Sequence, residues 1–574
     1  MNAERLLAHY EKIADAPDAI ARLRRFILDL AVRGRLVPQD LNDEPASELL
    51  QRIAAEKARL VKAGEIRQPK AIEPLDHSDL PFSIPKGWSW TQIARLGVLG
   101  PRNEAPDNLT ASFVPMPMIF AGYGVANDHE PRLWGEIKKG YTHFAEGDVG
   151  LAKITPCFEN GKSTVFRNLT GGIGSGTTEL HVVRPFFVDA NYVVLFLKSP
   201  HFIESGIPRM TGTAGQKRLP TEYFTSSPFP LPPVAEEHRI VAKVGELMAL
   251  CDQLEKSRAA REETRDRLTA VSLARLNDPD PETFQADARF ALDALPSITA
   301  RSDQIKQLRQ TILNLAVRGR LVTQDANDEP ATELLKRIAK ELSDYAAVNK
   351  IGKAHPEPIR DDDWPFSAPR GWQWTRLSAL FKAITDGDHQ PPPKADAGVA
   401  FLTIGNITTG RLDFSGCRLV PETYFKSLAP YRTPTKGDIL YTVVGATYGR
   451  PAMVETDREF CVQRHIAILK PAETASLRFL VILLGSPLIY DQASRSITGT
   501  AQPTIGLRPL RNFVAPLPPL AEQHRIVAKV DELIALCDHL EASLTTGETA
   551  RSRLLDGLLH EALEPGTDRL EAAA

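Results

Sequence analysis

The stretch AEEHRIVAKVGELMALCDQLE, residues 235–255, returns almost unchanged as AEQHRIVAKVDELIALCDHLE, residues 521–541. A second pair of segments repeats in the same order, since 23–57 and 308–342 are identical at 26 of 35 aligned positions. A repeat at a fixed spacing indicates one supersecondary unit that the chain uses twice. These two repeated segments, called the frames below, are therefore expected to perform one task twice, such as binding the same partner twice.

Between the frames lie two segments of similar length, 81–233 and 365–519, that have diverged. They share landmarks only: PFSIPKGWSW matches PFSAPRGWQW, MTGTAG matches ITGTAQ, and PLPP closes each segment. Shared landmarks at matching spacings predict a shared fold with different surface chemistry. The two segments are expected to perform two versions of a related task.

The repeated stretch itself predicts a long helix. Apolar residues recur at steps of four and three, which is the pattern of a coiled-coil seam. The seam positions are Ile240, Val244, Leu247, Cys251 and Leu254 in the first copy, and Ile526, Val530, Leu533, Cys537, Leu540 and Leu544 in the second. A helix from Glu236 to Asn277 would be roughly 60 Å long, which suits a spacer. The alternative is an amphipathic helix packed on its own domain, because the apolar stripe gives way to KSRAAREETRDR after the seam.

The diverged segments predict compact α/β domains of about 150 residues each. Short β-branched runs such as STVF, ELHVV, AFLTIGNI, DILYTVV and RHIAIL predict strands, and NYVVLFLKSPHFIESG and SLRFLVILLGSPLIYDQAS predict helices. The expected fold class is α/β, with two globular domains in pseudo-repeat separated by two long coiled-coil helices. The expected domains are a helical region at 1–75, a globular domain at 76–233, a long helix at 234–277, a linker at 278–300, a second helical region at 301–360, a second globular domain at 361–519, and a distal helix and tail at 520–574.

Composition places the chain among ordinary globular proteins. Its 574 residues are 43% hydrophobic and 25% charged, and a chain of this length divides into several domains. No apolar run approaches the roughly 18 residues that cross a bilayer, and the first residues lack the apolar core of a signal peptide. We expect a cytoplasmic protein with no membrane contact. The five cysteines have no CxxC pair, and we expect Cys251 and Cys537 to be buried small hydrophobes.

The charge of the chain is unevenly distributed. The net charge is −3, yet 81–233 carries +2 and 365–519 carries +6, so the remainder carries −11. Phosphate binding depends on local positive surface rather than on net charge. Nucleic acid is therefore a candidate partner of the globular segments.

Motifs for catalysis are weak in this sequence. CFENGKST, residues 157–164, ends like a phosphate-binding loop, but Pro156 stands where that loop needs glycine. Asp128, Glu136 and Lys138 are spaced loosely like the carboxylates and lysine of a metal-dependent nuclease. Such common residues at such spacing are expected by chance. We predict no catalytic residues, no metal site and no enzyme activity for the chain itself.

One order of motifs carries a family resemblance. DGDHQPPP, VAFLTIGNITTGRLDF, KGDILYTVVGATYGRPAMV, QRHIAILKP, ITGTAQ and APLPPLAEQHRIVAKVDELIALCD follow one another in the second half. This order resembles the DNA specificity subunits of type I restriction-modification systems, and the resemblance covers essentially the whole chain. In the first half, EGDVGLAKITPCFENGKSTV departs from the pattern.

The resemblance implies a function and a set of partners. Each globular domain would be a target recognition domain that reads one half of a bipartite sequence in double-stranded DNA. The two long helices would pack antiparallel as a spacer between the two readers. The frames would bind two methyltransferase subunits, and restriction subunits would join the same complex. The resemblance implies no cofactor on this chain, with S-adenosylmethionine, ATP and Mg²⁺ on the partner subunits. The methylated adenine would be flipped out of the duplex into the partner's pocket.

Contact residues follow from polar, glycine-containing loops and from cations, which suit phosphate and base contacts. The DNA-binding candidates are Lys153, Lys162, Thr213, Gln216, Lys217 and Arg218 in the first domain, and His389, Gln390, Thr447, Tyr448, Arg450, Thr500 and Gln502 in the second. The candidates for the partner interface are His238, Arg239, His524 and Arg525, at the starts of the long helices. Trp88, Trp90, Trp372 and Trp374 are expected to anchor domain cores rather than stack on bases.

Two other functions remain open from the sequence. A repeated coiled-coil adaptor that recruits only proteins would have the same frames without affinity for DNA. A nuclease that uses Asp128 and Glu136 would cleave DNA with Mg²⁺ and without a partner.

Overall fold

The computed structural model describes residues 15–69, 72–76, 78, 80–213, 215–278, 280, 282–350, 357–360, 363–388, 392–407, 410–499 and 502–563. The chain divides into two compact units. Unit 1 comprises Met1–Arg261 with Glu548–Ala574, and unit 2 comprises Glu262–Gly547. Each unit contains two helices from one copy of the repeat 23–57 and 308–342, called the frame helix pair. It also contains one globular segment and a part of both long helices. The domain limits predicted from sequence are finer than this division and stay predictions.

Two helices of 44 residues each dominate the helical content: α9 (Val234–Asn277) and α18 (Leu520–Leu563). In unit 1, α3 (Ala19–Val32) and α4 (Ala46–Lys62) form the frame pair. The sequence between them turns at Gly34, which has φ +65°, and a Cβ there would come within 2.5 Å of the Pro85 ring. Glycine is required here by both its backbone conformation and its close approach.

Contacts within unit 1 fix the direction of its helices. Arg24 on α3 pairs with Asp252 at 2.5 Å on α9, while the earlier residue Ala16 accepts a hydrogen bond from the later residue Arg258. Residue numbers therefore increase in opposite directions along the two helices, so α3 is antiparallel to α9. Against the end of α18, Arg22 meets Ser552 and Arg35 meets the Leu563 carbonyl, so α3 is parallel to that helix. Within unit 1 the parts of α9 and α18 are consequently antiparallel to each other.

The stretch that follows the seam of α9 is held by ion pairs and polar contacts before its apolar end. Arg261 pairs with Asp15 in unit 1. In unit 2, Glu262 pairs with Arg301 at 2.9 Å, and the buried Gln304 donates to Thr269 at 3.1 Å. This stretch is therefore not simply a solvated extension. The alternative interpretation, an amphipathic helix packed on its own domain, holds for the first turns of α9. Ile240, Val244 and Cys251 belong to the hydrophobic core of their own globular segment.

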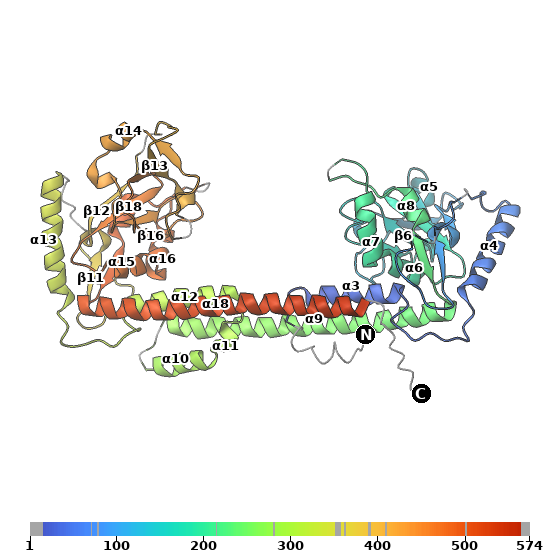
Figure 1. The fold of residues 1–574 in the computed structure, drawn as a ribbon, viewed down its shortest axis with the longest axis horizontal. Helices are drawn as coiled ribbons and strands as arrows, with labels where there is room; N and C mark the ends of the chain where they lie inside the picture. The colour runs from blue at the N-terminus through green and yellow to red at the C-terminus, as the bar shows by residue number, and fades with distance from the viewer. Residues whose placement is uncertain are drawn as a thin grey trace. The chain divides into compact units, whose positions relative to one another are not determined.

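The globular segment of unit 1, drawn in blue to green in Figure 1, contains both helices and strands. The strands form two four-stranded sheets and one two-stranded sheet. The first sheet has the order β2 (Gly97–Leu99), β9 (Leu180–Pro185), β6 (Val149–Ala152), β7 (Ser163–Val165). The second has the order β4 (Glu130–Leu133), β3 (Thr110–Val114), β8 (Ile173–Gly176), β5 (Thr142–Ala145). β1 (Ser89–Gln92) pairs with β10 (Pro228–Leu231), and the helices are α5 (Trp134–Ile137), α6 (Ala190–Leu197), α7 (Pro200–Gly206) and α8 (Thr221–Ser226).

Unit 2 has the same arrangement of sheets, except that its second sheet has three described strands and no counterpart of β5. Its sheets have the orders β12 (Phe381–Asp386), β18 (Ile466–Pro471), β15 (Ile439–Thr442), β16 (Pro451–Met453), and β14 (Arg418–Val420), β13 (Val399–Leu402), β17 (Phe460–Val462). β11 (Gln373–Arg376) pairs with β19 (Val514–Leu517), and the helices are α12 (Ser302–Val317), α13 (Ala331–Asn349), α14 (Glu422–Ser427), α15 (Leu477–Leu484), α16 (Pro487–Arg495) and α17 (Leu507–Asn512). The predicted α/β class, with two globular segments of one fold and two long helices, is confirmed.

Two sequence expectations need correction in detail. AFLTIGNI is a strand only as far as Leu402, because Thr403 caps a 3-10 helix at Ile404–Asn406 and its backbone N–H donates to the Asn406 side-chain oxygen at 2.8 Å. The expected linker at 278–300 contains helices α10 (Phe284–Asp293) and α11 (Leu295–Ile298). These helices bury Ala291 and Ile298 against the end of α9.

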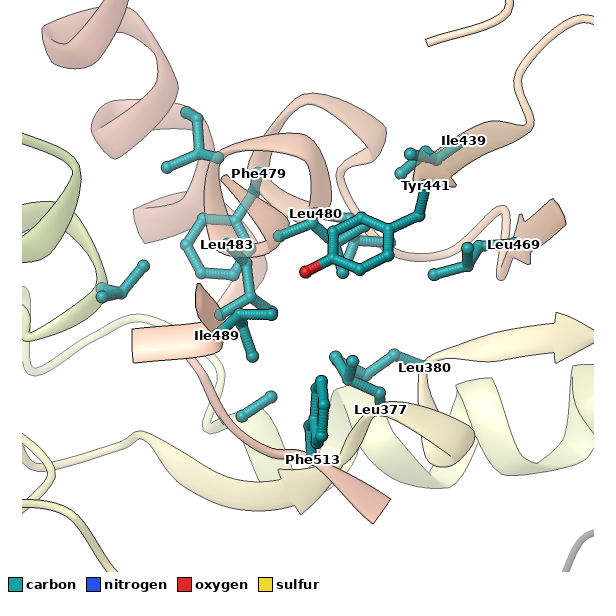
Figure 2. Packing of buried hydrophobic residues seen from close by; sticks show 14 of the residues in the cluster. Leu377, Leu380, Ile439, Tyr441, Leu469, Phe479, Leu480, Leu483, Ile489 and Phe513 are labelled. Carbon is teal, nitrogen blue, oxygen red and sulfur yellow. The ribbon is translucent and has the colours of Figure 1, made fainter. Parts of the chain in front are cut away.

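The core of unit 2 joins its frame, sheet and helices. Figure 2 shows Tyr441 of β15 pointing into this core near Leu480 of α15, with Leu377 and Phe513 closing it from another side. The entry tryptophans anchor these cores, as predicted: Trp88, Trp372 and Trp374 are buried, and the half-buried Trp90 packs against Phe82. Cys251 and Cys537 are buried, as expected.

A buried carboxylate ties each long helix to the first tryptophan of its globular segment. Glu236 accepts hydrogen bonds from Trp88 at 3.0 Å and from Gln39 at 3.2 Å. Glu522 does the same with Trp372 at 2.9 Å and Gln324 at 3.1 Å in unit 2. Burial raises the pKa of both carboxyls. The frame, the entry strand and the long helix of each unit are thereby joined at one point.

No helix in the described part of the chain is both long enough and apolar enough to cross a membrane.

Candidate nucleic-acid interface

The candidate residues of unit 1 lie on two loops that the backbone holds together. The turn between β6 and β7 carries Lys153 and Lys162, and the N–H of Ala152 donates to the Lys162 carbonyl at 2.9 Å. Lys162 therefore stands opposite the residue before Lys153. The second loop, 211–218, closes as a hairpin because Thr211 and Arg218 exchange backbone hydrogen bonds of 3.0 and 2.8 Å.

This hairpin is fastened directly to the β6–β7 turn. The N–H of Thr155 donates to the Lys217 carbonyl at 3.0 Å, and that of Leu219 donates to the Lys153 carbonyl at 2.7 Å. The structure thus brings together the unit 1 candidates Lys153, Lys162, Thr213, Gln216, Lys217 and Arg218. We call the segments 153–162 and 211–218 loop pair 1.

Unit 2 has the same arrangement with different side chains. The N–H of Thr442 donates to the Arg450 carbonyl at 3.1 Å, so Arg450 holds the position that Lys162 holds in unit 1. Thr498 and Thr504 exchange backbone hydrogen bonds of 3.0 Å, and Gly445 donates to the Pro503 carbonyl at 2.9 Å. We call the segments 443–450, 498–499 and 502–504 loop pair 2.

Loop pair 2 brings Thr447, Tyr448 and Arg450 close to Gln502. The buried Thr442 shapes its turn, since its hydroxyl donates to the Thr447 carbonyl at 2.6 Å and accepts from the Arg450 N–H at 3.0 Å. The candidates His389, Gln390 and Thr500 lie outside the described residues.

Tyr448 is held in place by a neighbouring helix. Its hydroxyl lies 3.0 Å from the Ser494 hydroxyl, and its ring stacks on Tyr490 with centroids 5.4 Å apart. The hydrogen bond with Ser494 lowers the pKa of Tyr448, while the bond with Tyr448 raises that of Tyr490. Tyr490 is 45% exposed on α16. Sequence reasoning missed Tyr490, because an exposed tyrosine on an amphipathic helix carries no local signal.

One predicted cation of loop pair 1 already has a partner. Arg218 grips Glu179 with two nitrogens, Nε at 3.0 Å and Nη2 at 2.8 Å. This hydrogen bonding holds the pKa of Glu179 below its ordinary value, with a further contribution from Lys153. Lys162 donates to the Met116 carbonyl at 3.3 Å. Glu179 was not among the residues predicted from sequence.

The predicted partner-interface residues fall into two kinds. Arg239 binds Asp43 of its own frame at 2.5 Å, and Arg525 binds Asp328 at 2.6 Å. These arginines therefore brace each long helix against its frame. His238 is different, because its side chain is 65% exposed, and His524 is also exposed.

The weak catalytic motifs adopt other roles. CFENGKST is a turn that leads into strand β7 rather than into the helix that a phosphate-binding loop precedes. Lys138 pairs with Asp107, and the Asp128 carboxylate accepts a hydrogen bond from the N–H of His129. Within the described ranges, no three His, Cys, Asp or Glu side chains gather in a way that could hold a metal ion.

Comparison with known proteins defines the class. Residues 369–546 match the family model described as type I restriction modification DNA specificity domain. The chain is 38% identical to the type I restriction enzyme EcoAI specificity subunit of Escherichia coli, over 95% of this chain and 94% of that protein. It is 40% identical to the EcoEI specificity subunit of Escherichia coli over the same shares.

A solved chain from work on complex assembly and conformational transition of the type I R-M system has the same fold. Its TM-score is 0.50 at 19% identity, covering 84% of this chain and 99% of that one. This likeness concerns the fold alone. The identity and coverage of the two relatives decide the family: the chain belongs to the specificity subunits of type I restriction enzymes.

Proposed function

We propose that this chain recognises a bipartite DNA sequence for a type I restriction-modification complex, with one globular segment reading each half-site. The observation that carries the proposal is the equivalence of the two loop pairs. The same backbone hydrogen bonds hold Lys162 in unit 1 and Arg450 in unit 2, whereas the surrounding side chains differ. One scaffold with two sets of polar side chains suits two different half-sites.

The chemistry of the loop pairs fits DNA. Lysine and arginine bind phosphate, and arginine also forms paired hydrogen bonds with guanine. Arg450, Thr447 and Tyr448 lie on one turn whose backbone is fixed by the buried Thr442. A fixed backbone lets these side chains keep one register on the duplex.

We further propose that the frames bind two copies of a methyltransferase subunit and that restriction subunits join the same assembly. Exposed residues of the frames are identical in both copies, although surface substitutions usually change stability little. These exposed pairs are Arg35 and Arg320, Asp40 and Asp325, Asn42 and Asn327, Glu44 and Glu329, Glu48 and Glu333, and Arg52 and Arg337. The segments between the frames diverged, so duplication alone does not account for this identity.

Under this proposal, the cofactors bind to the partner subunits rather than to this chain. S-adenosylmethionine, ATP and Mg²⁺ would belong to the partner subunits, and this chain would distort and position the DNA while the methyltransferase accepts the flipped adenine. The part played by this chain is therefore binding and orientation.

DNA recognition is tested by co-expressing the chain with its methyltransferase subunit and mapping methylated adenines across the genome by single-molecule sequencing. One bipartite motif with a fixed gap is expected. Lys162→Ala and Arg450→Ala should each weaken methylation that depends on one half-site, by roughly 5- to 150-fold if a contact of about 1–3 kcal/mol is lost. Arg289→Ala on α10 is the control, because this exposed arginine lies outside both segments. A stable complex that methylates no motif would contradict the proposal and leave a protein-only adaptor.

Partner binding is tested by native mass spectrometry of the same complex. Glu48→Arg and Glu333→Arg each reverse one exposed charge at equivalent positions of the two frames. Either variant should retain one methyltransferase copy, and the double variant should retain none. Glu104→Arg, exposed in the globular segment of unit 1, should leave two copies bound. If all variants, including Glu104→Arg, lost bound methyltransferase equally, the proposal of two independent binding sites on the frames would be contradicted.

A further inference from the structure

The turn that follows the central parallel strand occupies the same place in both units. In unit 1 the turn is Thr177–Glu179, between β8 and β9, and in unit 2 it is Gln463–His465, between β17 and β18. β8 pairs in parallel with β3, and β17 pairs in parallel with β13. Because parallel strands run in one direction, the residues that follow them meet at one edge of the sheet.

Each turn is bonded to its loop pair. The N–H of Lys153 donates to the Glu179 carbonyl at 3.0 Å in unit 1. The N–H of Val443 donates to the His465 carbonyl at 3.1 Å in unit 2. The turn is therefore a third element of the face that carries the proposed DNA contacts, and it comes from a part of the sequence outside the predicted site.

In unit 1 this turn lines an open cleft of about 570 Å³. Thr177 and Thr178 form one side, and Phe113, Tyr141 and Lys139 form others. The rings of Phe113 and Tyr141 meet edge to face with centroids 5.1 Å apart. The residues of the cleft thus combine aromatic surface, the hydroxyls of two threonines and one tyrosine, and one ammonium group.

The cleft is continuous with loop pair 1. Met116 lines it, and the Met116 carbonyl accepts the hydrogen bond from Lys162. On the other side, Glu179 follows Thr178 directly and holds Arg218. Lys162 and the Arg218–Glu179 ion pair therefore lie next to residues that line the cleft.

These groups suit the edge of a nucleobase. Threonine donates to and accepts from base edges, its methyl group contacts the thymine methyl, and aromatic rings pack against bases. The positive groups beside the cleft match the phosphates of the same strand. The occupant with this combination of apolar surface, hydrogen-bonding edge and neighbouring negative charge is a nucleotide of the target DNA.

Unit 2 places different chemistry at the same positions. Gln463 and Arg464 stand where unit 1 has Thr177 and Thr178, counted from the parallel strand pairs. Arg464 is exposed, and its Nε lies 3.3 Å from the His465 ring. Glutamine pairs with adenine and arginine with guanine through two hydrogen bonds each. Two threonines in unit 1 and a Gln-Arg pair in unit 2 would select different bases, as two different half-sites require.

We propose that this turn is a base-reading element of each globular segment, with Thr177 and Thr178 contacting bases in the cleft of unit 1, and Gln463 and Arg464 contacting bases in unit 2. The inference rests on the proposed function, because it assigns further specificity-determining residues to the same DNA face. It adds a third segment to each loop pair.

The test uses the purified complex of full-length chain and methyltransferase subunits. Methyl transfer from S-adenosylmethionine is measured on the cognate duplex and on a panel of duplexes that each change one base pair. Arg464→Ala should reduce discrimination at one or two adjacent positions of a single half-site by about tenfold, which corresponds to about 1.4 kcal/mol. The other half-site and the gap should remain unchanged.

Arg458→Ala is the matched control. Arg458 is an exposed arginine before β17, at the opposite end of the strand from Arg464, and packs over the Phe414 ring at 4.6 Å. Its removal should leave the profile of base preference unchanged. Thr178→Val provides the independent test in unit 1 and should change preference in the other half-site, so a folding defect in one variant does not leave the proposal untested.

Two results would overturn the inference. Equal weakening of all duplexes by Arg464→Ala and by Thr178→Val would make these residues phosphate contacts without a reading role. Unchanged preferences at every position in both variants would remove any role of the turn in base reading. Failure of the proposed function is distinguishable, because the parent complex would then methylate no bipartite motif before any variant is made.

Discussion

The Glu237 side chain accepts a hydrogen bond of 2.7 Å from the backbone N–H of Asp189, the residue that caps α6. Glu237 is fully buried, and burial raises its pKa to about 9. Its counterpart in unit 2 is Gln523, which accepts from the Ser476 N–H at 3.0 Å and donates to the Pro518 carbonyl at 2.9 Å. A protonated carboxyl in unit 1 thus stands where unit 2 uses an amide.

Glu237→Gln should make unit 1 more stable in mildly alkaline solution. The pKa is raised on folding from 4.5 to about 9, so the stabilisation from the protonated form is complete below pH 4.5 and is lost as the pH rises toward 9. The loss is at most about 1.4 kcal/mol per pH unit for one proton. Glutamine has no such proton to lose. Calorimetry of the full chain between pH 5 and 9 should show a higher unit 1 transition in the variant at pH 8.5.

Gln523→Glu is the matched control for this prediction. It should lower the unit 2 transition with rising pH and leave unit 1 unchanged. Parallel pH curves for Glu237→Gln and the parent chain would contradict a buried, protonated Glu237.

Lys198 should give the stability of unit 1 a pH dependence opposite to the one that Glu237 gives. Its ammonium nitrogen donates to the carbonyls of Ala121 at 2.8 Å and Gly161 at 2.9 Å, and burial lowers its pKa from 10.5 to about 7. The unfolded chain then holds the proton more tightly, so stability increases as the pH rises from about 7 to 10.5. Between pH 7 and 9 the effects of Lys198 and Glu237 oppose each other.

Lys198→Met should remove that increase and leave carbonyls without a donor, at a cost of about 2 kcal/mol. Since Gly161 precedes Lys162, the variant should also loosen loop pair 1 and weaken methylation through the corresponding half-site. Calorimetry across pH 7–10 and the duplex panel check the two effects. A variant with parent-like stability and parent-like base preference would show that the lysine does not hold the turn.

The sequence predicted helices, strands and loops better than it predicted which distant residues contact one another. Helical periodicity located both long helices, and glycine-containing polar loops located loop pairs 1 and 2. Glu179 and Arg218 are 39 residues apart in sequence and meet because of strand register. Arg239 and Asp43 are 196 apart. No local pattern marks such a pair, so the bracing role of Arg239 became visible only in the fold.

The coiled-coil prediction shows a related limit. A step of four and three identifies an apolar stripe but does not identify its partner. Ile240 and Val244 pack in the core of their own unit, as do Ile526 and Val530. The composition of a stripe is therefore predictable from sequence, whereas the surface that it covers depends on tertiary packing.

Thr442→Val should impair one half-site selectively. The buried hydroxyl satisfies the Thr447 carbonyl and the Arg450 N–H, and valine keeps the shape while leaving both groups without this partner. Unpaired buried groups cost about 1–3 kcal/mol. The duplex panel should show weaker discrimination in the half-site read by unit 2. Thr433→Val is the control, because the Thr433 hydroxyl makes only a long bond of 3.4 Å to the Ala429 carbonyl. Equal profiles for both variants would contradict a special role for Thr442.

Arg525→Ala should destabilise unit 2 while leaving methyltransferase binding intact. Asp328 has a side chain only 9% exposed and would lose its cation, at a cost of about 1–2 kcal/mol. Asp328→Asn in the same chain should remove most of that penalty, because the carboxylate is then no longer left unpaired. Thermal unfolding of the single and double variants measures this coupling, and native mass spectrometry counts the bound subunits. If Arg525→Ala lost a methyltransferase copy without lowering the unfolding temperature, Arg525 would be a partner contact, as the sequence first suggested, and not a brace.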